Sequence, residues 1–201
     1  MIRVLIAEDQ AMVRGALAGL LSLEPDIEVI AQVDRGDLVL EAARAHAADV
    51  ALLDIEMPGR DGIAVAGDLA RELPGTRALI LTTFGRPGYL RRAVERGAAG
   101  FLLKDSPSDR LAAAIRDVHA GRRVLDPGLA AAAIVEGDSP LTDRERDVLV
   151  ASAGHGTAAE IAARLFLAEG TVRNYLSSAI HKLGARNRAE ALSIAEEKGW
   201  L

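Results

Sequence analysis

The hydrophobic residues of the first 120 positions follow two alternating patterns. Short runs of β-branched and aliphatic residues alternate with stretches in which apolar residues recur at the spacing of a helix. Continuous apolar strands separated by amphipathic helices are typical of a parallel sheet covered on both faces. We therefore predict an α/β domain with a doubly wound, five-stranded parallel sheet. Its strands are expected at Ile2–Ala7, Ile27–Val33, Val50–Leu53, 78–82 and Gly100–Leu103. Its first helix is expected to bury Val13, Ala16, Leu17, Leu20 and Leu21.

The pattern changes after residue 120. Residues 121–138 contain Gly-, Asp- and Pro-rich pieces around an alanine-rich helical stretch, which is typical of a linker with one helix inside it. Residues 139–201 show helical periodicity throughout, enough for four short helices. The sequence therefore predicts a sheet domain at 1–120, a linker at 121–138 and a small all-α domain at 139–201. Four short helices can contain a helix-turn-helix.

Two capping boxes support the boundaries of these helices. Thr142 and Glu145, and again Thr157 and Glu160, stand three residues apart at the start of a helical stretch. In such a box the threonine hydroxyl accepts a hydrogen bond from a free backbone N–H group of the first turn. The acid accepts a hydrogen bond from the backbone N–H group of the capping residue. The acid also lies at the positive end of the helix dipole. We therefore expect helices to begin directly after both threonines.

The net charge of −5 argues, for the whole chain, against a nucleic-acid partner. The charge is unevenly distributed, however. Residues 1–120 hold 14 basic and 18 acidic residues, residues 121–138 carry −1, and residues 139–201 hold eight of each sign. Within residues 164–188 five basic residues stand against one acid, a net charge of +4. A DNA partner is therefore compatible with the helical domain.

Composition excludes several other classes of protein. The chain has no cysteine, which excludes a disulfide scaffold, an iron–sulfur cluster and a cysteine nucleophile. No apolar run approaches the roughly 18 residues of a membrane helix, and acids interrupt the N-terminal run, so we expect no membrane insertion and a cytoplasmic protein. Aromatic residues are 3% of the chain, too few for stacking on single-stranded nucleic acid.

Polar residues gather at the carboxyl ends of the expected strands, where parallel sheets bind their ligands. Glu8 and Asp9 follow the first strand, Asp54 the third, Thr82 ends the fourth, and Lys104 follows the fifth. A few carboxylates are the ligands that Mg²⁺ prefers, and a carboxylate beside the metal can attack a phosphoryl group. A hydroxyl and an ammonium group can then neutralise the phosphoryl oxygens. This edge is therefore a candidate Mg²⁺-dependent phosphoryl site.

The stretches around these residues resemble a known family. Residues 8–9 (Glu-Asp), 52–62 (LLDIEMPGRDG) and 100–104 (GFLLK), together with Thr82, are similar to the receiver domain of two-component response regulators. The resemblance covers residues 1–120 and implies a flavodoxin-like fold. It also implies a phosphoprotein whose Asp54 receives a phosphoryl group from a sensor histidine kinase.

The resemblance assigns further roles in the receiver. Glu8, Asp9, Asp54 and the backbone carbonyl of Glu56 would hold Mg²⁺. Lys104 would pair with the phosphoryl group, and Thr82 would move to bond it, drawing Phe101 inward as an aromatic switch. Two residues beyond Thr82 stands the bulky Phe84, which we expect to shield the phosphoryl group from water.

The basic part of the second domain contains a helix with two distinct faces. Val172, Leu176, Ala179, Ile180 and Leu183 are expected to point inward. The outward positions are Arg173, Asn174, Ser177 and His181. Arg and Asn are suited to reading guanine and adenine in the major groove, and a helix-turn-helix presents the start of its second helix to the bases. A solvated amphipathic helix would show the same two faces.

Sequence detail favours DNA binding over the solvated helix. The motifs at 141–149 (LTDRERDVL), 169–175 (EGTVRNY) and 182–191 (KLGARNRAEA) closely resemble the LuxR-type helix-turn-helix over residues 139–201. A receiver joined to this module is the arrangement of the NarL/FixJ response regulators. The sequence VRNYLS at residues 172–177 is most similar to the branch that regulates membrane-lipid desaturase genes. By resemblance Arg173, Asn174 and Ser177 face base edges. Phosphate contacts are implied for Thr171, Lys182, Arg186 and Arg188.

These observations predict a transcription factor and not an enzyme. Phosphorylation is expected to promote homodimerisation, so that two helix-turn-helix modules bind double-stranded DNA at paired half-sites. One alternative is a phosphorelay or interaction switch whose helical domain binds a protein. Another is a Mg²⁺-dependent phosphatase, which would need a separate acid or base beside Asp54, and no such residue is evident.

Overall fold

The computed structural model describes residues 1–83, 85–136, 139–154 and 156–201, with the side chains of residues 108 and 134–136 excluded. The prediction for Phe84 and the last two residues of the predicted linker therefore lie outside the described residues. The chain forms two compact units. One comprises Met1–Gly85 and Tyr89–Ala132, and the other comprises Arg86–Gly88 and Ala133–Leu201.

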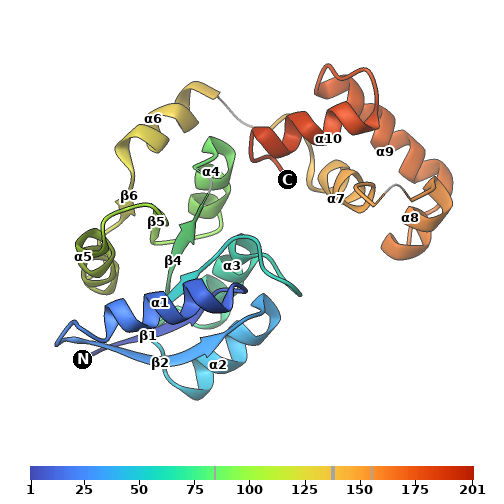
Figure 1. Ribbon diagram of the computed structural model, residues 1–201. Coiled ribbons are helices and arrows are strands. Elements are labelled where there is room, and N and C mark those ends of the chain that lie inside the picture. The colour runs from blue at the N-terminus through green and yellow to red at the C-terminus, as the bar shows by residue number, and fades with distance from the viewer. Residues whose placement is uncertain (84, 137–138, 155) are drawn as a thin grey trace. The chain divides into compact units, whose positions relative to one another are not determined.

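A parallel sheet forms the centre of the first unit, with its strands in the order β2-β1-β3-β4-β5-β6 (Figure 1). All neighbouring strands are parallel. The chain runs outward from β1 to β2 and returns past β1 to β3, so the carboxyl ends of β1 and β3 meet at the switch point of a doubly wound sheet. The predicted α/β fold is confirmed. The strands are β1 (Ile2–Ala7), β2 (Ile27–Val33), β3 (Val50–Leu53), β4 (Arg77–Thr82), β5 (Gly100–Leu103) and β6 (Val124–Leu125).

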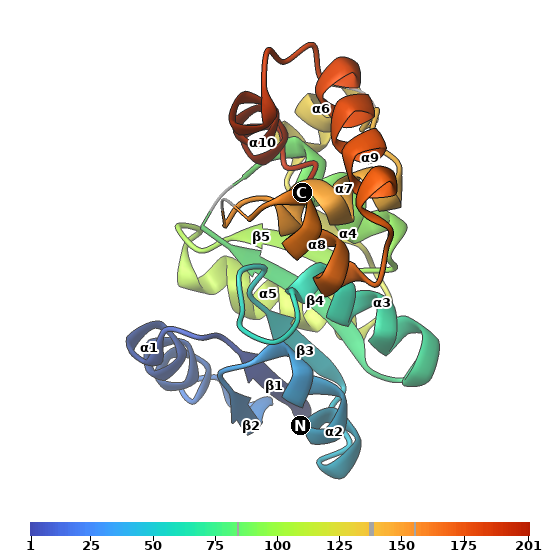
Figure 2. The same cartoon turned by 90° about the vertical axis from the view of Figure 1, so that its right-hand side faces the viewer.

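Helices cover this sheet, and one buried cluster shows how. Leu21 of α1 and Leu111, Ile115 and Val118 of α5 pack together against apolar residues of β1, β3, β4 and β5. Both helices therefore lie on the same face of the sheet (Figure 2). The helical elements of this part of the chain are α1 (Ala11–Leu21), η1 (Gly36–Leu38), α2 (Val39–Ala45), α3 (Gly62–Glu72), α4 (Pro87–Glu95), α5 (Ser108–His119) and α6 (Pro127–Glu136).

The structure differs from the sequence prediction in two places. A sixth strand, β6, pairs with β5 and comes from the segment predicted as linker, which also contains the expected helix as α6. In α1, Leu21 is buried and Leu17 packs against the core, but Ala16 is exposed and Leu20 is 43% exposed. The prediction that Ala16 and Leu20 are buried is wrong because α1 contacts the sheet through a narrower side than the apolar pattern suggested.

The second unit contains the four expected helices, and both predicted capping boxes are present. Val148, Ile161 and Val172 form one small core, and Leu149, Ala191 and Ala195 form another. These cores pack α9 against α7, α8 and α10, in a helix-turn-helix arrangement of α8 and α9 (Figure 2). The helices are α7 (Asp143–Ala151), α8 (Ala158–Leu165), α9 (Glu169–Lys182) and α10 (Arg188–Glu197).

None of the helices in the described ranges has both the length and the apolar character that crossing a bilayer requires.

Candidate functional site

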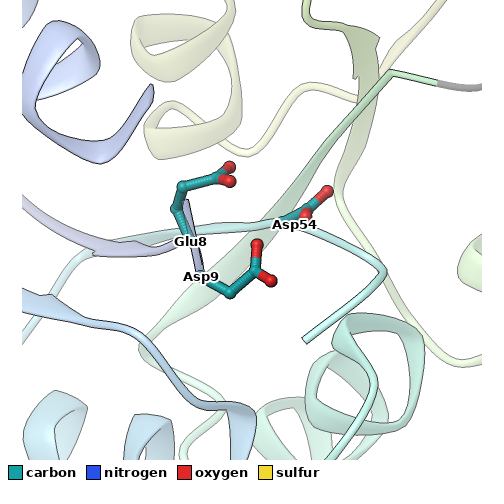
Figure 3. Close-up of side chains that lie close together, drawn as sticks. All are labelled: Glu8, Asp9 and Asp54. Carbon is teal, nitrogen blue, oxygen red and sulfur yellow. The ribbon is translucent and has the colours of Figure 1, made fainter. Parts of the chain in front are cut away.

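Three carboxylates lie close together at the carboxyl ends of β1 and β3 (Figure 3). Ala7 pairs with Leu53 in the sheet, so the residues that follow these strand ends, Glu8 and Asp54, leave the sheet side by side. Ligand atoms of Glu8, Asp9 and Asp54 all lie within 4.8 Å of one another. Glu8 and Asp54 are buried, whereas Asp9 is exposed. The structure therefore places together the three acids that the sequence predicted, open to solvent on the side of Asp9.

Lys104 completes this cluster from the end of β5, which β4 separates from β3 in the sheet. Its Nζ atom lies 2.7 Å from Oε2 of Glu8 and 3.1 Å from Oδ1 of Asp54. Its backbone N–H donates to the carbonyl of Thr82 at the end of β4, 2.8 Å away, which fixes where the lysine leaves the sheet. One ammonium group therefore neutralises part of the charge of two buried carboxylates.

The electrostatics of the cluster set Asp54 apart. Burial raises the pKa of Asp54 from 3.8 to about 6; the Lys104 ammonium group opposes this rise, and the nearby Glu8 charge adds to it. Burial alone would lower the pKa of Lys104, but its bond to Glu8 and its attraction to Asp54 outweigh this, so the pKa of Lys104 is raised. Asp54 is thus mostly ionised at pH 7 but is held in its charged form at a cost. A cation or a covalent modification at this carboxylate would relieve that cost.

The remaining predicted receiver residues lie near the same edge or directly behind it. Thr82 ends β4 and is buried, at 2% exposure. Phe101 lies in β5 and is completely buried, so it already occupies an inward position in this structure. Glu56 lies two residues beyond Asp54 with an exposed side chain, in the loop that leads from β3 to α3.

Further residues fix the position of this loop, and the sequence reasoning did not single them out. Arg60, in the loop, forms an ion pair of 2.7 Å with Asp68 of α3, whose side chain is only 4% exposed. Gly62 begins α3 so close to Asp54 that an added Cβ atom would lie 2.0 Å from the Asp54 carbonyl oxygen. These contacts therefore hold the end of the Glu56 loop that leads into α3.

Arg14 of α1 acts on the other side of the cluster. Its guanidinium group donates to the backbone carbonyls of Glu8 and Asp9, and so holds the turn that carries both acids. Arg14 is the only charged residue in α1, one turn beyond the acid pair. A lone charge in an otherwise uncharged helix at that spacing is the signal that could have identified it.

The residues predicted to read DNA all lie on α9. Arg173, Asn174, Ser177 and His181 are all exposed, and Thr171 is half-buried. The inward residues predicted for this helix pack as expected, with Val172 and Ala179 fully buried and Leu176, Ile180 and Leu183 packed against the cores. These four polar residues therefore lie on one exposed side of α9.

The basic residues predicted to meet phosphates are already engaged within the unit. Lys182 Nζ lies 2.7 Å from Oε2 of Glu145, and Arg186 Nε lies 2.9 Å from Oε2 of Glu190. Arg188 donates to the carbonyl of Gly156 at 2.8 Å. Two of the partner acids, Glu145 and Glu190, lie outside residues 164–188, so the net charge of +4 for that segment overstated the free positive charge. Arg173, among the predicted base contacts, also forms an ion pair, with Glu169.

Glu145 has a larger role than its capping box suggested. It is 4% exposed, and besides Thr142 it accepts from Ser178 Oγ at 2.6 Å and from Lys182. Burial alone would raise the pKa of Glu145, but the bonds from Lys182, Ser178 and Thr142 outweigh it and lower the pKa to about 2. Glu145 therefore stays charged and ties α7 to α9.

Comparison with known families assigns both parts of the chain. Residues 4–116 match the response regulator receiver domain, and residues 139–195 match the bacterial regulatory proteins of the luxR family. The two matches cover the sheet unit with its carboxylate cluster and the helical unit with α9.

Two curated relatives match this chain over nearly all of their length. The chain is 49% identical over 201 residues to the uncharacterized transcriptional regulatory protein YvfU of Bacillus subtilis (strain 168), covering 100% of both. It is 46% identical over 200 residues to the transcriptional regulatory protein DesR of the same organism, covering 100% of this chain and 99% of DesR.

A solved structure agrees with these matches. The crystal structure of the response regulator ChrA, from a heme-sensing two-component system, superposes with a TM-score of 0.59 at 34% identity over 100% of this chain and 98% of ChrA. The chain therefore belongs to the NarL/FixJ-type response regulators, which are transcription factors and not enzymes, are phosphorylated on an aspartate of the receiver domain and bind DNA through a LuxR-type helix-turn-helix.

Proposed function

We propose that Asp54 is the phosphoacceptor, and that a sensor histidine kinase supplies the phosphoryl group. The observation that carries this proposal is the position of Asp54 between two other carboxylates and the Lys104 ammonium group. An Asp54 carboxylate oxygen attacks the phosphorus atom of the phosphohistidine, an O–P bond forms and the N–P bond breaks. Lys104 then faces the new phosphoryl oxygens, and Thr82 supplies a hydroxyl group from the end of β4.

Mg²⁺ is the cofactor that we propose for this step, because hard oxygen ligands in a small cluster suit it. Glu8, Asp9 and Asp54 would hold the ion together with the backbone carbonyl of Glu56. When bound, it neutralises phosphoryl charge as a Lewis acid. Arg14 and the Arg60–Asp68 pair keep the acids and the Glu56 loop in position.

On the DNA side, we propose that the exposed residues of α9 enter the major groove. Arg173, Asn174 and Ser177 would face base edges, because they are exposed on the first turns of this helix. Phosphate contacts are proposed for Thr171, Arg186 and Arg188, and for Lys182 if its buried partner releases it. Ion pairs of exposed arginines cost little to exchange for a phosphate.

We further propose that phosphorylation promotes a homodimer that binds paired half-sites, since two tethered modules gain effective concentration. The protein would act in the cytoplasm, where its DNA is. The division into a receiver at 1–120, a linker at 121–138 and a DNA-binding domain at 139–201, and the similarity to the desaturase-regulator branch, remain predictions.

Phosphorylation by a small acyl phosphate tests the assignment directly. The wild type should gain one phosphoryl group in intact-mass measurements when Mg²⁺ is present and none in EDTA. Asp54→Asn should gain none under either condition. Asp34→Asn, which changes an exposed acid just beyond β2, is the matched control and should behave like the wild type. Undiminished labelling of Asp54→Asn would show that another residue is the acceptor.

A further inference from the structure

The helical unit contains a buried carboxylate with an unusual set of partners. The two carboxylate oxygens of Glu145 accept from the Thr142 backbone N–H at 2.7 Å, Thr142 Oγ1 at 2.9 Å, Ser178 Oγ at 2.6 Å and Lys182 Nζ at 2.7 Å. Ser178 and Lys182 stand one turn apart on α9, whereas Glu145 is on α7. The carboxylate therefore joins two helices at two consecutive turns of α9.

The second capping box of the same domain shows that capping alone does not require these contacts. Glu160 accepts from the Thr157 backbone N–H at 2.7 Å and from Thr157 Oγ1 at 3.0 Å, as Glu145 does from Thr142. Glu160 is exposed, however, and within the described residues its side-chain hydrogen bonds join it only to Thr157 of its own box. The burial of Glu145 and its two bonds to α9 are thus additional to a function in capping.

The Lys182 ion pair also differs from those of the other basic residues around α9. Arg186 and Arg173 have side chains that are 85% and 68% exposed, paired with acids that are at least 30% exposed. Such pairs open readily, so both arginines can turn to a phosphate. If Lys182 turned away, it would leave a carboxylate of 6% exposure without its counter-charge, which is strongly unfavourable.

We propose that Lys182 is a positioning residue, which with Glu145 fixes the rotation and axial position of α9, and that it does not neutralise a DNA phosphate. Ser178 and Lys182 hold the side of α9 that faces α7, so they determine the direction in which Arg173, Asn174 and Ser177 point. The inference rests on the proposed role of α9 in reading DNA. It changes the phosphate-contact set by removing Lys182 from it.

The two roles of Lys182 predict different salt dependence. A lysine that neutralises a phosphate contributes about 0.9 to the slope of log K against log salt, whereas a lysine that stays paired with a buried carboxylate contributes nothing. The probes are a duplex enriched from random DNA by the wild-type protein and a duplex of scrambled sequence. Binding of the full-length protein to both is measured at several salt concentrations.

Lys182→Gln should lower the ratio of affinities for the selected and scrambled duplexes by about tenfold or more, with an unchanged salt slope. Arg186→Gln is the matched control. The salt slope of its DNA binding should fall by about 0.9 for each lost phosphate contact, and the ratio of its affinities for the selected and scrambled duplexes should stay near the wild-type value. A fall of about 0.9 in the slope of Lys182→Gln, with its ratio preserved, would overturn the proposal.

Glu145→Gln provides a second measurement in case Lys182→Gln folds poorly. If Lys182 is a positioning residue, this variant should also lose discrimination with an unchanged slope. If Lys182 is a phosphate contact, releasing it should strengthen binding and steepen the slope by about 0.9. Arg173→Gln separates failure of the inference from failure of the proposed function. If that variant binds the selected duplex as the wild type does, α9 is not the reading helix.

Discussion

Asp54 is the residue at which the charge needed for the proposed phosphoryl transfer most clearly lowers the stability of the fold. Burial raises its pKa from 3.8 to about 6, so the folded protein binds a proton at this carboxyl group more tightly than the unfolded chain does. Stability from this group is present at low pH and is lost as pH rises from about 4 to 6. Holding the ionised form at pH 7 costs the folded state up to about 3 kcal/mol. The proposed phosphoacceptor thus destabilises the folded protein at pH 7 when no metal is bound.

Asp54→Asn should therefore stabilise the protein in EDTA at pH 7 by up to about 3 kcal/mol, since Asn has the same shape without the buried charge. Lys104 keeps its 2.7 Å partner Glu8 in the variant. The gain should shrink as pH falls from 6 towards 4 and vanish near pH 3, where the wild-type carboxyl group is protonated in both the folded and the unfolded state. Urea unfolding of both proteins at several pH values measures this. A gain that is the same at pH 4 and pH 7 would show that the charge of Asp54 is not its cause.

Glycines at two positions should respond in opposite ways to the same substitution. Gly62→Ala would place a Cβ atom 2.0 Å from the Asp54 carbonyl oxygen, so the loop or the strand end must move. We expect it to destabilise the receiver by about 3 kcal/mol and to slow phosphoryl transfer to Asp54.

Gly19→Ala in α1 is the matched control for that substitution. A Cβ atom there meets nothing within 4 Å, so this variant should gain up to about 1 kcal/mol from helix propensity and keep its phosphorylation rate. The comparison is made by urea unfolding together with acyl-phosphate labelling. If both variants have equal stability, the close approach at Gly62 does not constrain the loop.

Among the helices, α9 alone of α7–α10 lacks a side-chain cap at its start. Thr142, Thr157 and Asn187 each accept a backbone N–H at the start of α7, α8 and α10, whereas Ala168 stands before α9 in an extended conformation that a capping serine could adopt. Glu169 at the first position places an acid at the positive end of the dipole, but its carboxylate also pairs with Arg173. The helix that we propose to read DNA thus begins without a side-chain cap.

Ala168→Ser should therefore stabilise the helical unit by about 1 kcal/mol through a new cap. Ala163→Ser, at an exposed position inside α8, is the control and should cost a few tenths of a kcal/mol, because serine is a weaker helix former than alanine. Chemical unfolding followed by Trp200 fluorescence compares the two, and equal effects would show that the site does not accept a cap.

The elements also show which features a sequence can specify. Five strands and the polar residues at the ends of four of them were predictable, because each feature is local: an apolar run that ends in a polar residue. The two-residue strand β6 was not, since Val124 and Leu125 are too few to show a pattern. Glu145 was recognised as a cap but not as a link to α9, because its partners Ser178 and Lys182 lie 33 and 37 residues away. Contacts across such distances depend on packing.

At the scale of the whole molecule, the chain divides into two units that are stabilised by different buried clusters and differ in the pH dependence of their stability. Each unit has its own buried cluster, one around the sheet and the others between α7, α8, α9 and α10. The pH dependences have opposite signs. The ionisation of Asp54 reduces the stability of the folded state as pH rises from about 4 to 6. Glu145, whose pKa is lowered to about 2, has the opposite effect. Its contribution to stability is complete above its ordinary pKa of 4.5 and disappears as pH falls towards 2. One stability curve cannot describe both units.

Mg²⁺ should consequently stabilise one unit and leave the other unchanged. Trp200, the only tryptophan, packs with Leu149, Ala191 and Ala195 and so reports on the helical unit. At about 100 times its dissociation constant, Mg²⁺ should add about 2.7 kcal/mol to the receiver, shifting its transition in far-UV circular dichroism. The Trp200 midpoint should not move, and Asp9→Asn should abolish most of the shift because it removes one of the three carboxylates. A Trp200 midpoint that rises with Mg²⁺ would mean that the two units unfold as one.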